Sequence, residues 1–162
     1  MRVDWKSLII SIVIPLTVGA VAGLLTMGGM EAFANLNKPP LSPPAWLFPV
    51  VWTLLYILMG ISSYLIYVSE PGDKNTKENN EKNVALSTYG YQLVVNFLWP
   101  VFFFNFQWYF FALLWLLLLW ILVAKMILEF GTIVRAAAFL NIPYLLWLSF
   151  AGYLNLGIWI LN

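Results

Sequence analysis

The sequence predicts an all-α membrane protein: a bundle of five transmembrane helices with a proline-rich loop between the first and the second. Two observations predict this fold class. Of the 162 residues, 62% are hydrophobic and only 9% are charged, and the mean hydropathy is +0.85, whereas about a quarter of the residues of a soluble domain are charged. The apolar residues also gather in five blocks, each long enough, or nearly so, to cross a bilayer as a helix. We expect a single domain over residues 1–162.

The five blocks define the predicted helices in chain order. They are Leu8–Met27, Trp46–Val68, Val84–Phe104, Trp108–Ala124 and Ala136–Leu161. None alternates as the strands of a membrane β-barrel do. Residues 105–107 alone separate the third block from the fourth, which predicts a tight antiparallel hairpin. The segment 69–83 between the second and third blocks holds seven of the fifteen charged residues, so we expect a solvated loop there.

The basic residues predict the orientation in the membrane, because cytoplasmic loops are enriched in Lys and Arg. Seven of the eight fall on one side of the predicted bundle: Arg2, Lys6, Lys74, Lys77, Lys82, Lys125 and Arg135. Only Lys38 falls on the other side. We therefore expect the N-terminus in the cytoplasm and the C-terminus outside.

The composition excludes several kinds of chemistry. The chain has no cysteine and no histidine, so it has no disulfide, no thiolate nucleophile, no imidazole base and no Cys or His metal site. A net charge of +1 offers no basic face for nucleic acid. No predicted span has an ionisable residue at its centre, as proton-coupled transporters usually do. We expect no hydrolase, no metal site and no required cofactor; binding, sensing, passive transfer and ligand-assisted chemistry remain.

Prolines concentrate in the first loop, where Pro39, Pro40, Pro43 and Pro44 lie within six residues. Proline fixes φ and restrains the residue before it, so this segment is stiff. It is either a rigid connector into the second helix or a lid over the outer end of the bundle. Three more prolines lie inside predicted spans and are expected to kink them: Pro15, Pro100 and Pro143.

Aromatic and polar side chains recur at helical spacing in three of the spans. The stripes are Trp52, Tyr56, Met59 and Ser63; Gln92, Asn96, Trp99 and Phe103; and Tyr144, Trp147, Ala151 and Asn155. The amides should face the interior, because an unpaired amide in hydrocarbon is costly. The stripes either fill the bundle by packing or line a cavity for a large flat apolar ligand. Gly19 and Gly23 likewise suit close packing, within the chain or between two copies.

The proline-rich loop and one motif on each of three predicted helices resemble those of the TspO/MBR family, whose members include bacterial tryptophan-rich sensory proteins and the mitochondrial translocator protein. The similarity extends over essentially the whole chain. It is carried by Asn37-Lys38-Pro39-Pro40 with Pro43-Pro44-Ala45-Trp46-Leu47-Phe48-Pro49, Val51-Trp52-Thr53-Leu54-Leu55-Tyr56, Gln92-Leu93 with Asn96 and Trp99-Pro100, and Pro143-Tyr144-Leu145-Leu146-Trp147 with Leu154-Asn155.

The resemblance implies a five-helix bundle, often a homodimer, with a pocket near the end that the first loop closes. It implies porphyrins and related flat hydrophobic molecules as ligands. The residues it assigns to the pocket are Trp52, Asn96, Trp99, Tyr144, Trp147 and Ala151, to which the stripes add Tyr56. Some relatives promote light- and oxygen-dependent breakdown of protoporphyrin, which would give Trp52 and Trp147 a photochemical role with the porphyrin as substrate.

Two departures from the family pattern bear on ligand contacts. Many relatives have Trp where this chain has Leu41, and the sterol motif of eukaryotic members is incomplete because no Lys or Arg follows Tyr153. Three functions are therefore weighed: a receptor or carrier that regulates tetrapyrrole level or transfer, a porphyrin-degrading enzyme that uses the same pocket, and a membrane interaction protein with an incidental cavity.

Overall fold

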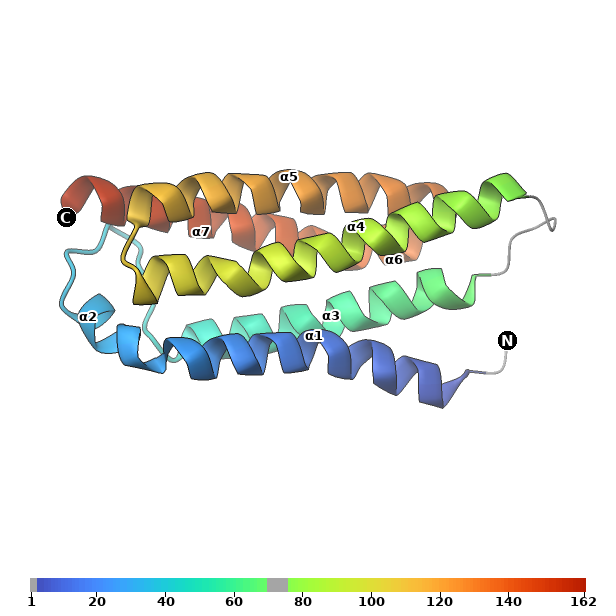
Figure 1. Ribbon diagram of the computed structural model, residues 1–162, viewed down its shortest axis with the longest axis horizontal. Helices are drawn as coiled ribbons and strands as arrows, with labels where there is room; N and C mark the ends of the chain where they lie inside the picture. The colour runs from blue at the N-terminus through green and yellow to red at the C-terminus, as the bar shows by residue number, and fades with distance from the viewer. Residues whose placement is uncertain (1–2, 70–75) are drawn as a thin grey trace.

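The structure, a computed structural model, describes residues 3–69 and 76–162, and over these residues it is helical, with no strand (Figure 1). Arg2 and Lys74, on which the predicted orientation partly relies, lie outside the described residues. The elements are α1 (Trp5–Thr26), a 3₁₀ turn (Met27–Gly29), α2 (Met30–Ala34), α3 (Leu47–Val68), α4 (Thr76–Pro100), a π-helical turn (Val101–Asn105), α5 (Tyr109–Ile133), α6 (Arg135–Leu140) and α7 (Ile142–Leu161).

The long helices run up and down along one axis. Helix α1 packs against α3, α4 against α5, and α5 against α7. Short α2, the loop before α3, the α4–α5 turn and the end of α7 all lie at one end of the bundle, whereas α1 begins and α3 ends at the other (Figure 1). The predicted tight hairpin is confirmed. The π turn leads into Gln107, whose φ of 56° is left-handed, and the Trp108 N–H donates to the Phe102 carbonyl at 3.1 Å.

Four helical stretches in the described part of the chain are long and apolar enough to cross a membrane: Trp5–Gly29, Leu47–Val68, Tyr109–Ile133 and Arg135–Leu161. The predicted third span becomes α4, which is 25 residues long but less apolar. Its polar side chains at Gln92 and Asn96 are buried, so they face the bundle and not the surroundings. Within the described residues, length and hydropathy therefore support four spans, and α4 packs on the bundle through its polar face.

Helix α4 begins eight residues earlier than predicted, so residues 76–83 of the expected loop are helical. A helix that projects beyond the apolar layer needs no apolar face, which is why the hydropathy pattern misses this part. Lys82 ties it to the end of α3, because its ammonium donates to the Tyr67 and Ser69 carbonyls. Cations near a helix C-terminus satisfy its last carbonyls in this way.

The prolines act differently from the prediction at two of three positions. Pro15 does lie inside α1 and is buried. Pro100 is the last residue of α4, where the helix changes to the π turn. The predicted kink at Pro143 is wrong: the fifth block is broken at Asn141 into α6 and α7, and Pro143 lies in the first turn of α7. Proline is tolerated there because the first helical N–H groups have no partner within the helix.

The break between α6 and α7 is fixed by buried hydrogen bonds. The Asn141 amide donates to the Ser62 hydroxyl at 2.6 Å and to the Ala137 carbonyl at 3.0 Å, and the Ser62 hydroxyl donates to the same carbonyl at 2.8 Å. Because Ser62 belongs to α3, these bonds join the helix break to the middle of the bundle. A hydropathy pattern carries no information about this contact.

Helices α1 and α3 approach each other closely at Gly60. A Cβ placed on Gly60 would lie 2.5 Å from the Ile12 Cα and 2.7 Å from the Ser11 carbonyl oxygen, both of them backbone atoms. We expect Gly60→Ala to push the helices apart and to lower stability by about 1–3 kcal/mol, measured as a lower Tm in detergent. Gly90→Ala is the matched control, since a Cβ there meets nothing within 4 Å; equal effects of the two variants would contradict the close approach.

Candidate functional site

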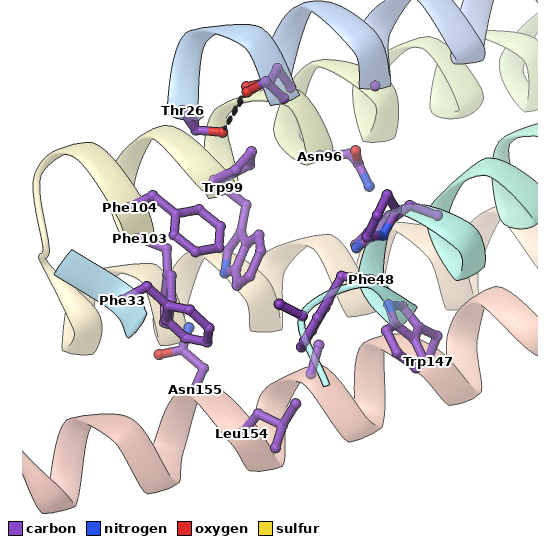
Figure 2. A pocket seen from close by; sticks show the side chains of 18 of the residues that line it. Thr26, Phe33, Phe48, Asn96, Trp99, Phe103, Phe104, Trp147, Leu154 and Asn155 are labelled. Carbon is purple, nitrogen blue, oxygen red and sulfur yellow. Dashed lines mark hydrogen bonds between the residues drawn. The ribbon is translucent and has the colours of Figure 1, made fainter. Parts of the chain in front are cut away.

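A cavity of about 610 Å³ lies at the end of the bundle near the first loop (Figure 2). Helices α1, α3, α4 and α7 and the loop before α3 all contribute to it. Of the predicted site residues, the structure brings together on its lining Trp52, Tyr56, Asn96, Trp99, Trp147 and Ala151. The stripes that the sequence shows on three separate helices therefore meet around one empty volume.

Aromatic rings form two facing sides of this cavity. Trp99 stacks on Phe103 with centroids 5.1 Å apart and meets the edge of Phe104 at 6.2 Å. Across the cavity, Phe48 meets Trp147 edge-on at 5.9 Å (Figure 2). Trp52 adds its ring beside Tyr56, at 5.5 Å. Rings held by such contacts are preorganised to contact the faces and edges of a flat apolar molecule.

A chain of buried hydrogen bonds forms the deep end. The Tyr56 hydroxyl donates to Asn96 Oδ1 at 2.8 Å, Asn96 Nδ2 donates to the Tyr144 hydroxyl at 2.7 Å, and Tyr144 donates to Gln92 Oε1 at 3.1 Å. Gln92 Nε2 reaches Met59 Sδ at 3.7 Å. The chain links α3, α4 and α7 and leaves Asn96 fixed at the cavity wall.

Tyr144, which was predicted to line the pocket, is not on the cavity lining. It is fully buried behind Asn96 and meets the edge of Trp52 at 6.1 Å. Through this hydrogen-bond network Tyr144 supports Asn96 and Tyr56, which do line the cavity. Helical spacing puts Tyr144 on the same face as Trp147, but spacing alone does not distinguish a lining residue from one behind it.

The proline-rich loop forms one wall of the cavity, through Lys38, Ser42, Pro43 and Ala45. The other three prolines lie off the lining. Buried Pro39 packs on α7, where a Cβ on Gly157 would lie 2.6 Å from its ring, and the Pro40 carbonyl accepts from the Tyr153 hydroxyl at 2.8 Å. Leu41 has a φ of 66° and is 82% exposed, so it points away from the cavity.

The loop is also held to the end of α7 by a reciprocal amide pair. Asn162 Oδ1 accepts from the Asn37 N–H at 3.0 Å, and Asn162 Nδ2 donates to the Asn37 carbonyl at 3.0 Å. Asn162→Ala is expected to speed hydrogen exchange of the Asn37 amide about fivefold, because a typical hydrogen bond contributes about 1 kcal/mol. Asn162→Asp keeps the acceptor and serves as control; unchanged exchange in Asn162→Ala would show that the pair does not hold the loop.

Asn155, also predicted to face inward, lines the cavity and bonds to the first turn of α5. With its nitrogen toward α5, it donates to the Tyr109 carbonyl at 2.9 Å and accepts from the Leu113 N–H at 3.2 Å. Its amide is therefore occupied by the protein. By contrast, Trp147 Nε1 is buried and has no acceptor within the described part of the chain.

Sequence reasoning missed one entire wall, the small-residue face of α1 formed by Gly19, Ala20, Ala22 and Gly23. A Cβ on Gly19 would lie 2.1 Å from the Tyr56 ring, so this glycine serves packing within the chain. The four-residue glycine spacing is the signal that was available. Sequence reasoning also missed four phenylalanines as wall residues: Phe33, Phe48, Phe103 and Phe104. Of these, only Phe103 lies on one of the predicted stripes.

This fold and cavity define a class: an all-helical, multi-pass membrane protein with an aromatic pocket under a proline-rich loop. The family model for the TspO/MBR family matches residues 11–160. The chain belongs to the TspO/MBR family.

Named relatives agree with this assignment. The chain is 41% identical over 130 residues to "Tryptophan-rich protein TspO" of Chlorobaculum tepidum, covering 80% of this chain and 78% of that protein. It is 34% identical over 160 residues to "Translocator protein" of Bos taurus, covering 98% and 92%. It is 32% identical over 155 residues to "Tryptophan-rich sensory protein" of Cereibacter sphaeroides, covering 96% and 90%.

Proposed function

We propose that this protein is a membrane receptor or carrier that binds porphyrins and related flat hydrophobic molecules in the aromatic cavity and regulates tetrapyrrole level or transfer. The observation that carries the proposal is the cavity itself. Its volume of about 610 Å³ falls within the range of small-molecule sites, which is about 300–1,000 Å³. Its walls are indole, phenol and phenyl rings, with hydrogen-bonded amides at the deep end, which suits a planar apolar ligand.

Titration with protoporphyrin IX tests the proposal. The purified protein in nonionic detergent is expected to shift the porphyrin absorption band saturably, with one porphyrin per chain. Tryptophan fluorescence should be quenched in parallel, because Trp52, Trp99 and Trp147 line the cavity. A shift that grows linearly, without saturation, would reflect partition into detergent alone. It would leave the third function, interaction with membrane partners, as the better explanation.

A second function, photo-oxidative porphyrin degradation, is favoured by the arrangement around Trp52. Its ring lies 5.5 Å from Tyr56 and 6.1 Å from Tyr144, so electron-rich rings are in contact at the cavity wall. The porphyrin absorbs the light and dioxygen is the oxidant, with Trp52 and Trp147 among the indoles that line the cavity. Porphyrin decay under light should slow in the Trp52→Phe/Trp147→Phe variant; unchanged decay would refute a protein role.

We also propose that α4 is the fifth transmembrane helix, that the N-terminus is cytoplasmic and the C-terminus outside, and that the chain forms a homodimer. The support for the fifth span is that α4 packs against both α3 and α5 along the bundle.

Labelling of single cysteines tests the orientation. Because the chain has no cysteine of its own, one introduced Cys reports on one side of the membrane. A Cys at exposed Asn80 should resist an impermeant reagent in intact cells, whereas one at exposed Asn37 should react; the opposite pattern would reverse the orientation.

A further inference from the structure

Lys38 is the one charged residue on the described lining of the cavity. It lies in the loop wall, where its ammonium is 4.8 Å from the centroid of the Phe33 ring, and Phe33 also lines the cavity. The charge is therefore at the rim of an otherwise neutral and mostly apolar volume. A cation at such a position needs a compensating group or water.

No carboxylate among the described side chains pairs with Lys38. Its polar contact is with the Ala34 carbonyl at 3.5 Å, which is a long hydrogen bond. The ion pair found among the described side chains is Lys125–Glu129, on α5 away from the cavity. Lys82 offers a comparison, because its ammonium donates to two carbonyls that end α3. Lys38 makes one longer contact of this kind, to the carbonyl of Ala34 at the end of α2.

The neutral hydroxyl donors of the lining are already used. Thr26 donates to the Ala22 carbonyl at 2.9 Å, Ser42 to Pro39 at 2.7 Å, and Thr53 to Pro49 at 2.8 Å. Tyr56 donates to Asn96, as described above. The unpaired buried donor on the described lining is the neutral Trp147 Nε1, and an acidic group buried without a charged partner is costly. At the loop wall it would find the Lys38 ammonium, which no described carboxylate pairs with.

We infer that the cavity takes a flat apolar molecule that carries a carboxylate at one edge, and that Lys38 pairs with this carboxylate at the loop. The inference rests on the proposed function and narrows it to acidic ligands in one orientation: the ring system lies among the aromatic side chains and the acid edge lies at the first loop. Lys38 then acts as a specificity residue that distinguishes acids from their neutral esters.

The test compares protoporphyrin IX, a diacid, with its dimethyl ester on wild-type protein and on Lys38→Met in nonionic detergent without anionic lipid. The two porphyrins partition differently into micelles, but this difference is the same for both proteins and cancels in the ratio. A partly exposed ion pair contributes up to about 1 kcal/mol. We therefore expect Lys38→Met to lower affinity for the diacid about fivefold relative to the ester, and 0.5 M salt to reduce this difference.

Two variants make the result specific. Lys38→Arg keeps the positive charge and should retain the preference for the diacid. Lys125→Met removes a cation of the same sign outside the cavity and should leave both affinities unchanged. Equal loss of affinity for both porphyrins in Lys38→Met, or no loss for either, would overturn the inference while leaving porphyrin binding in place. Failure of wild-type protein to bind either porphyrin would instead refute the proposed function, and this inference with it.

Discussion

Replacing Trp52 and Trp147 together with alanine is expected to weaken protoporphyrin binding about fiftyfold. The two indoles line the cavity, Trp52 beside Tyr56 and Trp147 against Phe48. Ring stacking contributes about 0.5–1.5 kcal/mol per pair beyond burial. Loss of two rings with part of their buried area therefore removes about 2.3 kcal/mol, and each 1.4 kcal/mol is a factor of ten. The measurement is a porphyrin absorbance titration, which does not depend on the number of tryptophans.

The matched control for this prediction is Trp108→Ala/Trp159→Ala. Both of these indoles are off the cavity lining, 56% and 44% exposed, so the control removes the same number of tryptophans from the surface. We expect its affinity to stay within about twofold of wild type, since surface changes away from a site are usually small. If both double variants weakened binding equally, the porphyrin would not lie between Trp52 and Trp147.

Asn96→Leu is expected to lower stability by about 2 kcal/mol, seen as a lower Tm in detergent. Asn96 accepts from Tyr56 and donates to Tyr144, all three side chains being buried. Leucine matches the size but leaves the Tyr56 hydroxyl without an acceptor, and an orphaned buried donor costs about 1–3 kcal/mol. Because Asn96 also forms part of the cavity wall, porphyrin affinity should fall in the same variant.

A second substitution separates loss of a hydrogen bond from loss of packing. In Asn96→Leu/Tyr56→Phe the orphaned hydroxyl is gone, while Tyr144 still donates to Gln92. The double variant is therefore expected to be more stable than Asn96→Leu alone, by about 1 kcal/mol. Additive destabilisation, with the double variant the least stable, would show that the network contributes through shape and not through its hydrogen bonds.

The helices could be predicted from sequence to within a few residues where one local signal dominates. Trp46–Val68 becomes Leu47–Val68, and the hairpin at 105–107 follows from the shortness of the connection. Prediction failed where two local signals overlap. Polar residues 76–83 hide the first turns of α4, and apolar residues around Asn141 hide the break between α6 and α7. In both places the helix boundary does not coincide with a change in hydropathy. A prediction from hydropathy alone therefore misses it.

The candidate site could be predicted in part, because indole and amide residues at helical spacing must share a face. Trp52, Trp99 and Trp147 do meet around the cavity. The α1 wall was missed because glycine and alanine give no signal in a hydropathy pattern, and the spacing of Gly19 and Gly23 indicates close packing without indicating a cavity. The place of Tyr144 also depends on its neighbours: Asn96 of α4 lines the cavity and donates to the hydroxyl of the buried Tyr144 on α7.

By itself, the sequence determined that this chain is helical, apolar and free of thiol and imidazole chemistry, and which residues share each helix face, because these properties arise from composition and from contacts within a few residues. Only the tertiary structure decided that a cavity separates the faces, that the loop forms one wall of it, and that Lys38 lies at its edge with no carboxylate partner among the described side chains. Those features depend on distances between helices far apart in the chain, which are fixed by close approach at Gly60 and by buried hydrogen bonds such as Tyr56–Asn96.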